Sequence, residues 1–187
     1  MPETPSTMVP LGTQAPAFSL PDTMSGKTVT LDGVKSKVAT VVMFICNHCP
    51  YVKHINAELV RTAKEYQAKG VSFVAICAND ISQQPGDSPA GMKANAQKLG
   101  FTFPYLYDES QAVAKAYNAA CTPDIYVYDK DLKLAYRGQF DDARPSKPTP
   151  VTGKDLRAAL DSLVAGRPVG AAQRPSAGCN IKWKGAA

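Results

Sequence analysis

The sequence predicts an α/β fold in which a central mixed sheet is flanked by helices. Two apolar runs, 38–45 and 71–77, are continuous enough to be strands buried on both faces. Between them, residues 51–66 carry apolar side chains at helical spacing. Two further apolar segments, 125–128 and 132–136, flank a short polar turn and predict a hairpin. A strand–helix–strand unit followed by a hairpin is the layout of a sheet covered by helices.

The N-terminal part of the chain precedes the first buried strand. Residues 1–16 are rich in proline and threonine, and we expect them to be flexible. The segments 17–20 and 28–31 flank a polar turn and predict a short hairpin or paired extended segments. The helix after the first buried strand is predicted over about 47–69, with Gly70 suited to its C-terminal end.

The second half of the chain alternates helices with short strands. The predicted elements are a polar loop at 79–89, a helix at about 90–99, a strand at 103–106, a helix at 110–117, the hairpin and a last helix at about 153–165. The residues after the last helix show little regular pattern. We therefore expect a flexible N-terminus over 1–16, one domain over 17–166 and a C-terminal tail over 167–187.

The composition is that of a globular chain without a nucleic-acid or membrane signature. The 187 residues include 21 basic and 16 acidic side chains, a net charge of +5, and these charges are scattered. Nucleic-acid binding calls for a basic stripe interleaved with aromatic residues, which the sequence lacks. No apolar run approaches the roughly 20 residues that span a bilayer. We therefore expect no nucleic-acid or membrane partner.

The cysteines and the first residues bear on the compartment. Five cysteines, an odd number at irregular spacing, do not indicate a disulfide framework. The first residues lack the basic and apolar regions of a signal peptide. We expect a cytoplasmic protein, or a periplasmic one if a signal peptide has been removed.

The motif Cys46-Asn47-His48-Cys49-Pro50 lies between the first buried strand and the long helix, where dithiol redox chemistry is expected. The start of a helix offers unpaired backbone N–H groups and the positive end of the peptide dipole. Both stabilise a thiolate, which is the form that attacks a disulfide. We expect Cys46 to be the more exposed nucleophile with a depressed pKa, and Cys49 to be the resolving thiol.

Zinc binding is the alternative interpretation of this cysteine pair. Cys46 and Cys49 would supply two ligands, and the other two would come from His48, His54, Cys121 or Cys179. Zinc sites of this kind usually occupy knuckles or loops, and the sequence holds no second closely spaced cysteine pair. We therefore predict that the site holds no metal.

Three features together give a resemblance to a known family. They are the strand–Cys-x-x-Cys–helix unit, the Thr122-Pro123 pair that leads into a strand, and the extension from Asp22 to Leu31. Over about residues 15–165 the chain resembles a thioredoxin-fold protein of the redoxin class, the AhpC/TSA-type group of peroxiredoxin-like proteins and thiol–disulfide oxidoreductases. The resemblance implies a thioredoxin-like fold and a cis Pro123 that faces the Cys46 sulfur.

The same resemblance implies roles for the neighbours of the cysteines. His48 is similar to the histidine in the Cys-Pro-His-Cys motif of the strongly oxidising DsbA-type enzymes, where an imidazole would stabilise the Cys46 thiolate. The alternative is that His48 points to solvent. Thr122 and Pro123 would form the edge with which an extended substrate peptide pairs.

Two further cysteines are candidate redox thiols. Cys121 precedes the Thr122-Pro123 pair, so it should lie close to Cys46; its alternative role is that of a small packed side chain. Cys179 lies in the tail. It would act as a resolving thiol if the tail folds back onto the site, and would otherwise be inert.

The sequence departs from the family patterns at positions that matter for the chemistry. Peroxiredoxins carry Pro-x-x-x-Thr-x-x-Cys, and here Ala39 and Met43 replace the proline and the threonine. The arginine expected beside that site is not evident, and Arg137 is a poor substitute. Thr40 stands where thioredoxin has a buried acid. These departures argue against efficient peroxidase chemistry and against a fast reductase of the thioredoxin type.

We therefore expect a thiol–disulfide oxidoreductase that exchanges the Cys46–Cys49 dithiol or disulfide with substrate disulfides or thiols, without a cofactor. Its partners would be a protein or small molecule with a thiol or disulfide, and a reducing system such as thioredoxin or glutathione. One alternative is a peroxiredoxin-like thiol peroxidase with antioxidant activity, in which Cys46 is oxidised to a sulfenic acid. The other is a non-catalytic redox-sensing or thiol-binding module.

Overall fold

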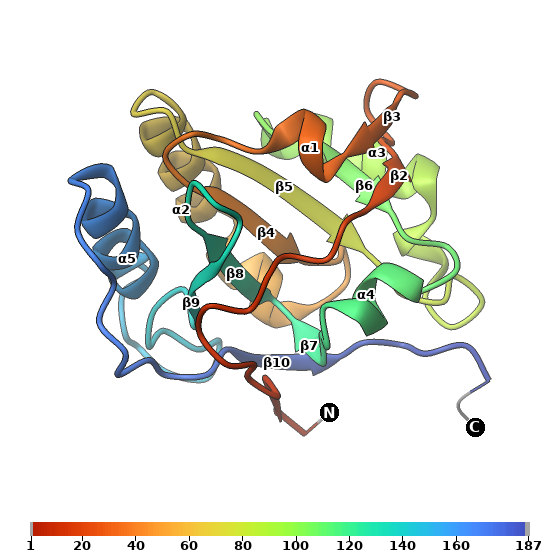
Figure 1. The fold of residues 1–187 in the computed structure, drawn as a ribbon. Coiled ribbons are helices and arrows are strands. Elements are labelled where there is room, and N and C mark those ends of the chain that lie inside the picture. Colours follow the sequence, from red (N-terminus) through yellow and green to blue (C-terminus); the bar gives the residue numbers. More distant parts are fainter. Residues whose placement is uncertain (1, 186–187) are drawn as a thin grey trace.

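The computed structural model describes residues 2–185, and its centre is a five-stranded mixed sheet with the strand order β6-β5-β4-β8-β9 (Figure 1). Its strands are β4 (Thr40–Phe44), β5 (Ser72–Cys77), β6 (Tyr105–Tyr107), β8 (Asp124–Tyr128) and β9 (Leu134–Gly138). β5 runs parallel to both β4 and β6, whereas β8 is antiparallel to β4 and β9 to β8. The predicted central mixed sheet is confirmed.

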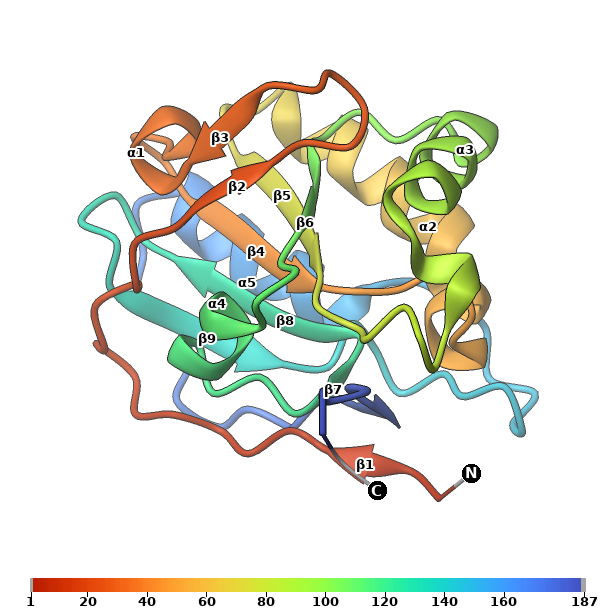
Figure 2. The same cartoon turned by 90° about the vertical axis from the view of Figure 1, so that its right-hand side faces the viewer.

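Helices cover both faces of this sheet (Figure 2). On one face lie α2 (Pro50–Gln67), α3 (Pro89–Leu99) and α5 (Lys154–Val164). On the other face lie the short helices α1 (Leu31–Val34) and α4 (Ala112–Ala116) with the hairpin of β2 (Ser19–Pro21) and β3 (Thr28–Thr30). The two parallel strand pairs are thus buried from both sides, as the continuous apolar runs indicate.

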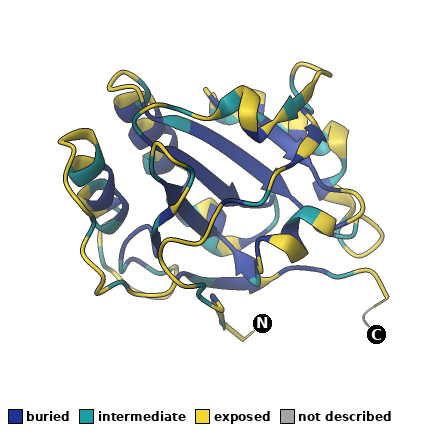
Figure 3. Cartoon of the chain, in the orientation of Figure 1, coloured by how far each residue is buried: buried dark blue, intermediate teal, exposed yellow. Residues whose placement is uncertain are grey.

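The core has two layers because side chains alternate across each strand. Val41 and Met43 of β4 pack under α2, while Val42 and Phe44 point to the opposite layer. Figure 3 shows the central strands as the most continuously buried part of the chain. The site described below lies on the α2 side, at the end of β4.

A second, three-stranded sheet joins the two ends of the chain, in the order β1 (Thr4–Pro5), β10 (Ala177–Asn180), β7 (Cys121–Thr122) (Figure 1). The expectation of a loosely held N-terminus and an unpatterned tail is therefore wrong for these segments. β1 and β10 are too short to carry a periodic signal, and their hydrogen bonds are made to residues far away in the sequence.

The long helix differs from its prediction at its start. α2 begins at Pro50 instead of near residue 47, and Cys49 is its N-cap residue. Proline is favoured in a first helical turn, because the N–H that it lacks would have no partner there. Over residues 2–185, every helix is too short or too polar to cross a membrane.

Candidate active site

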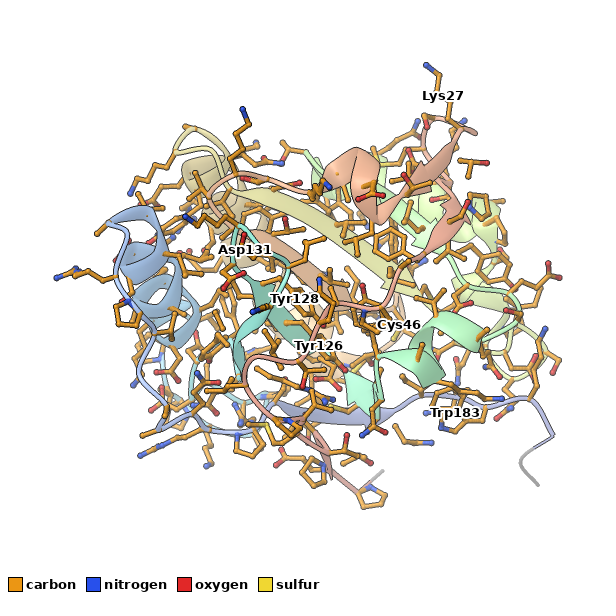
Figure 4. The ribbon with its side chains drawn as sticks, in the orientation of Figure 1. Lys27, Cys46, Tyr126, Tyr128, Asp131 and Trp183 are labelled. Atoms are coloured by element: carbon orange, nitrogen blue, oxygen red, sulfur yellow. The ribbon has the colours of Figure 1, made fainter. Side chains whose placement is uncertain are left out.

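The two motif cysteines lie between β4 and α2. Cys46 follows the end of β4, and Figure 4 labels it in the interior of the molecule. Cys49 caps α2, with Pro50 as the first helical residue. All five cysteines of the chain are free thiols in this structure.

The Thr122-Pro123 turn lies against both sulfurs. The peptide bond before Pro123 is cis, as the family resemblance implies. Cys46 Sγ lies 3.4 Å from the Thr122 hydroxyl, and Cys49 Sγ donates to the Thr122 carbonyl oxygen at 3.2 Å. One residue therefore contacts both members of the pair, through its side chain and its backbone.

Both cysteines are buried, with only 1 % of Cys46 and none of Cys49 exposed. Cys46 is thus not an exposed nucleophile in this structure, because both thiols are covered. Two segments explain the burial. The short helix η1 (Pro85–Asp87) is hydrogen-bonded to Asn47 beside Cys46, and β10 packs on α2 beside Cys49.

The interaction between the two neighbouring thiols governs their ionisation. It lowers the pKa of Cys49 to about 4, helped by the backbone N–H of Val52, and it raises the pKa of Cys46, together with burial and the charge of Asp87. The expected depression of the Cys46 pKa is therefore wrong for this conformation, because the helix offers its N–H groups at Cys49. The Thr122 carbonyl opposes the effect, since it accepts only from a protonated Cys49. The pair therefore loses its first proton at Cys49 and keeps the second at Cys46, and the two thiols titrate as a coupled pair.

Asp87 is a site residue that the sequence analysis missed. Its carboxylate is fully buried and contacts His48 Nδ1 at 2.7 Å. It also accepts hydrogen bonds from the Asn47 backbone N–H at 2.7 Å and from Asn79 Nδ2 at 2.9 Å. Burial alone would raise the pKa of Asp87, but these hydrogen bonds outweigh it and leave the pKa below its usual value, so the carboxylate is charged. The polar loop predicted at 79–89 therefore places a buried negative charge beside the motif.

His48 does not simply point to solvent. Its side chain is 20 % exposed, its Nδ1 is held by Asp87, and its Nε2 is buried without a partner among residues 2–185. Cys46 Sγ, one ring nitrogen of His48 and one oxygen of Asp87 all lie within 4.8 Å of one another. A thiol, an imidazole and a carboxylate in this order resemble the nucleophile, base and orienting group of a catalytic triad.

The same three side chains are those that could hold a metal ion. A structural zinc site requires four ligands, and of the residues that the structure describes this cluster brings together only Cys46, His48 and Asp87. The further zinc ligands considered from the sequence, His54, Cys121 and Cys179, are not part of it. The Asp87–His48 contact has the length of a hydrogen bond, so the geometry favours a polar relay.

The backbone of Thr122 is already paired with the chain's own tail. Cys179 of β10 lies opposite Thr122, and Asn180 lies opposite Cys121, in an antiparallel ladder. This ladder occupies the edge that we expected to receive an extended substrate peptide. The tail cysteine is correspondingly buried, with 3 % of its surface exposed.

Cys121 is directed away from the motif. Neighbouring residues of a strand point to opposite sides, so Thr122 and not Cys121 presents its side chain to Cys46. The Cys121 thiol instead contacts the Pro123 carbonyl oxygen at 3.6 Å, and its pKa is raised by burial and by the charge of Asp124. The expectation that Cys121 lies next to Cys46 as an exchange partner is therefore not supported by its orientation.

Arg137 lies on the far side of the central sheet from Cys46. It is opposite Tyr126 on the neighbouring strand, and its guanidinium group lies over the Tyr126 ring at 4.3 Å. Tyr126 packs in the layer opposite α2, whereas Cys46 belongs to the α2 layer. Arg137 forms a buried ion pair with Asp124 at 3.0 Å, so it takes no part in the surroundings of the cysteines.

The sequence matches the model of a known protein family. The model of the AhpC/TSA family matches residues 11–137, a range that includes Cys46, Cys49 and the Thr122-Pro123 turn. The chain belongs to the AhpC/TSA family. Comparison with curated proteins returned no match.

Two solved structures are similar to this chain over almost their whole length. An uncharacterized conserved protein from Geobacillus kaustophilus has 61% identity and a TM-score of 0.98, with 100% of this chain and 99% of that chain covered. A hypothetical protein from Sinorhizobium meliloti 1021 has 47% identity and a TM-score of 0.95, with coverages of 98% and 100%.

A more distant likeness bears on the fold alone. A secreted disulfide oxidoreductase from Mycobacterium tuberculosis, described as homologous to a DsbE, has 16% identity and a TM-score of 0.59, with 78% of this chain and 95% of that chain covered. The predicted thioredoxin-like fold is confirmed by this likeness together with the family match.

Proposed function

We propose that this AhpC/TSA-family chain is a thiol–disulfide oxidoreductase whose redox centre is the Cys46–Cys49 pair. The observation that carries the proposal is the contact of both sulfurs with Thr122 beside the cis Pro123. A pair that loses its first proton well below the usual thiol pKa supplies a thiolate at neutral pH, which is the reacting species in disulfide exchange.

The reaction consists of two exchanges. The one proton that the pair retains first moves from Cys46 to Cys49, whose thiol donates to the Thr122 carbonyl oxygen. The Cys46 thiolate then attacks one sulfur of a substrate disulfide and forms a mixed disulfide, while the other substrate sulfur leaves as a thiolate. Cys49 then loses that proton and attacks Cys46 Sγ, which releases the second substrate thiol and leaves a Cys46–Cys49 disulfide. A dithiol partner of the thioredoxin type or glutathione returns two electrons to the pair.

His48 and Asp87 support the Cys46 side of this cycle. The His48 ring, held by the Asp87 carboxylate, lies close to Cys46, and in its protonated form it would be an opposite charge that stabilises the Cys46 thiolate when the proton resides on Cys49. The same pair stabilises Cys46 as a leaving group when the disulfide is reduced. Stabilisation of the thiolate favours the reduced state and makes the disulfide more oxidising.

Three assays with the full chain test the proposal. The first follows turnover of hydroxyethyl disulfide or insulin with thioredoxin and thioredoxin reductase, the second follows turnover of hydrogen peroxide with the same reductants, and the third measures the reduction potential of the Cys46–Cys49 pair. We expect disulfide turnover that is lost in both Cys46→Ser and Cys49→Ser. Rapid peroxide turnover would instead indicate a thiol peroxidase, and a disulfide that forms without any turnover would indicate a redox-sensing module.

A further inference from the structure

The tail strand β10 lies on the redox site in the manner of an added peptide strand. It pairs antiparallel with β7, and its Cys179 is in register with Thr122, the residue that contacts both motif sulfurs. In strand addition, main-chain hydrogen bonds hold a peptide at a sheet edge and set which of its side chains face the site. Here the strand belongs to the chain itself and carries a thiol at the aligned position.

β10 is anchored on both sides of Cys179. Before it, Ser176 Oγ donates to the Pro123 carbonyl oxygen at 2.5 Å. After it, the Lys182 backbone N–H donates to Asn79 Oδ1 at 2.9 Å. The tail cysteine is therefore held at a defined place, whereas a segment without such contacts would bring it to the site only transiently.

The approach of β10 to the site is close because Gly178 has no side chain. A Cβ atom at this position would lie 2.0 Å from the Thr122 carbonyl oxygen, which is too near for any other residue. Behind this contact, Cys179 belongs to the same buried cluster as Cys46 and Cys49, and it pairs with Thr122, whose carbonyl oxygen accepts a hydrogen bond from Cys49 Sγ. The tail thiol thus lies near the second cysteine of the motif.

We propose that Cys179 is a third redox-active thiol that takes over the disulfide of the Cys46–Cys49 pair by exchange at Cys49 Sγ. The inference rests on the proposed exchange reaction at Cys46 and Cys49. It assigns the role of internal resolving partner to the strand that covers the site, and it predicts a Cys49–Cys179 bond that ties β10 to the start of α2.

The exchange is balanced without an external oxidant. Cys179 loses its proton and its sulfur forms a bond to Cys49 Sγ. The Cys46–Cys49 bond breaks, and Cys46 leaves with the electron pair as a thiolate that takes up the released proton. One thiol and one disulfide become one disulfide and one thiol. Two electrons from the dithiol partner of the proposed cycle later reduce the Cys49–Cys179 bond.

The charges around Cys179 favour this order of events. In the reduced protein, burial and the neighbouring Cys49 raise the pKa of Cys179 to about 12, so the tail thiol stays protonated. Once Cys49 is bonded to Cys46 it carries no charge, and the nearby Lys182 ammonium favours the Cys179 thiolate. Burial still opposes ionisation, but the contribution of Cys49 is gone, so the Cys179 thiolate forms more readily after the first disulfide than before it.

Disulfide mapping of the full chain tests the inference. The reduced protein is oxidised with hydroxyethyl disulfide, quenched with acid, alkylated with N-ethylmaleimide and digested with trypsin. Cys46 and Cys49 lie on one tryptic peptide, 38–53, so their disulfide stays within it, whereas a bond to Cys179 joins two peptides. We expect both species, with Cys46 alkylated in the joined one. In Cys179→Ala we expect loss of the joined peptides and of Cys46 alkylation in the oxidised protein.

Two variants sharpen this test. Cys46→Ser should form the Cys49–Cys179 bond directly in a glutathione redox buffer. Cys121→Ala, which alters a cysteine on the strand that pairs with β10 but faces away from the site, should keep the joined peptides. A Cys46–Cys49 disulfide that forms and turns over while Cys179 remains unlinked would overturn the inference and leave the proposed function intact. A bond from Cys179 to Cys46 would overturn the assigned exchange, and failure of the Cys46–Cys49 disulfide to form would overturn both proposals.

Discussion

At the scale of single residues, Asp87 organises the surroundings of Cys46. Its two carboxylate oxygens bind three groups, on Asn47, His48 and Asn79, so one buried anion joins the motif to the loop after β5. Burial of a carboxylate is costly unless its acceptor sites are filled, and here they are. The immobilised charge makes His48 a group with a defined position instead of a free surface imidazole.

Replacement of His48 by glutamine should make the Cys46–Cys49 disulfide less oxidising. Glutamine retains an amide that can donate to Asp87 but cannot be protonated as an imidazole can, so the thiolate loses the neighbouring group that is able to carry a positive charge. We expect the reduction potential to fall by about 30 mV, which corresponds to roughly 1.4 kcal/mol for a two-electron couple. Equilibration in glutathione buffers gives the potential. His54→Gln, which alters the other histidine one turn along α2, is the control, and an unchanged or raised potential in His48→Gln would contradict a tuning role.

The lowered first ionisation of the thiol pair should make the stability of the reduced protein depend on pH. A thiol with a pKa of about 4 in the folded state and of about 8.5 in the unfolded chain binds more protons when unfolded. The contribution of this thiol to the free energy of unfolding is therefore fully present above the pKa of the unfolded chain. It is lost as the pH falls toward the folded-state pKa of about 4. We expect the melting temperature of the reduced protein to rise between pH 5 and pH 8 relative to that of reduced Cys49→Ala. A pH-independent difference between the two proteins would show that the pair keeps both protons.

At the scale of elements, local patterns predicted some parts of the site and not others. The Cys46–Cys49 motif and the Thr122-Pro123 turn are short contiguous signals, and the structure brings them together. Asp87 contacts His48 across 39 positions of sequence, and no local pattern records such a contact. β10 has four residues, which is too few for a periodic pattern. Its pairing with β1 and β7 depends on residues that are far away in the sequence. The start of α2 was placed too early because Asn47 and His48 are bound to the loop after β5 and leave Cys49 to cap the helix.

Gly178→Ala should loosen β10 from the site. The added methyl group would lie so close to the Thr122 carbonyl oxygen that β10 or β7 must move. We expect a loss of unfolding free energy of about 1–3 kcal/mol, the range for overpacked positions, and faster iodoacetamide alkylation of Cys46 and Cys49. Gly170→Ala is the matched control, since nothing lies within 4 Å of a Cβ atom there. Equal alkylation rates in the two variants would mean that β10 does not limit access to the sulfurs.

At the scale of the whole molecule, the central sheet separates two sets of polar groups. The motif cysteines, His48 and Asp87 gather on the α2 side, whereas Arg137 and its partner Asp124 are bound on the other. The apolar runs of the sequence predict this sheet well, because continuous apolar strands in a strand–helix–strand order are compatible with few sheet topologies. The face that each polar side chain takes follows from strand register, which the sequence alone does not determine.

Hydrogen peroxide should therefore react slowly with this protein. Cleavage of the O–O bond needs donors fixed on the developing charge, and here Met43 replaces the family threonine while Arg137 lies across the sheet. We expect stopped-flow oxidation of Cys46 to be no faster than that of an ordinary thiolate of similar exposure. The sulfenic acid formed can be trapped with dimedone in Cys49→Ser. A rate several orders of magnitude higher would move the chain to the thiol peroxidases.

Because β10 is the last strand of the described fold, the site is covered only late in synthesis. Every other helix and strand precedes this strand in sequence, so the ladder over the two sulfurs forms only after the rest of the described fold has been made. Domains fold from their N-terminal part as they leave the ribosome. A ribosome-bound chain that ends before residue 177 would carry an uncovered dithiol beside the cis Pro123, and release of the last strand would close it. The newly made chain would thus expose its dithiol to surrounding disulfides for a period that ends when β10 pairs with β7.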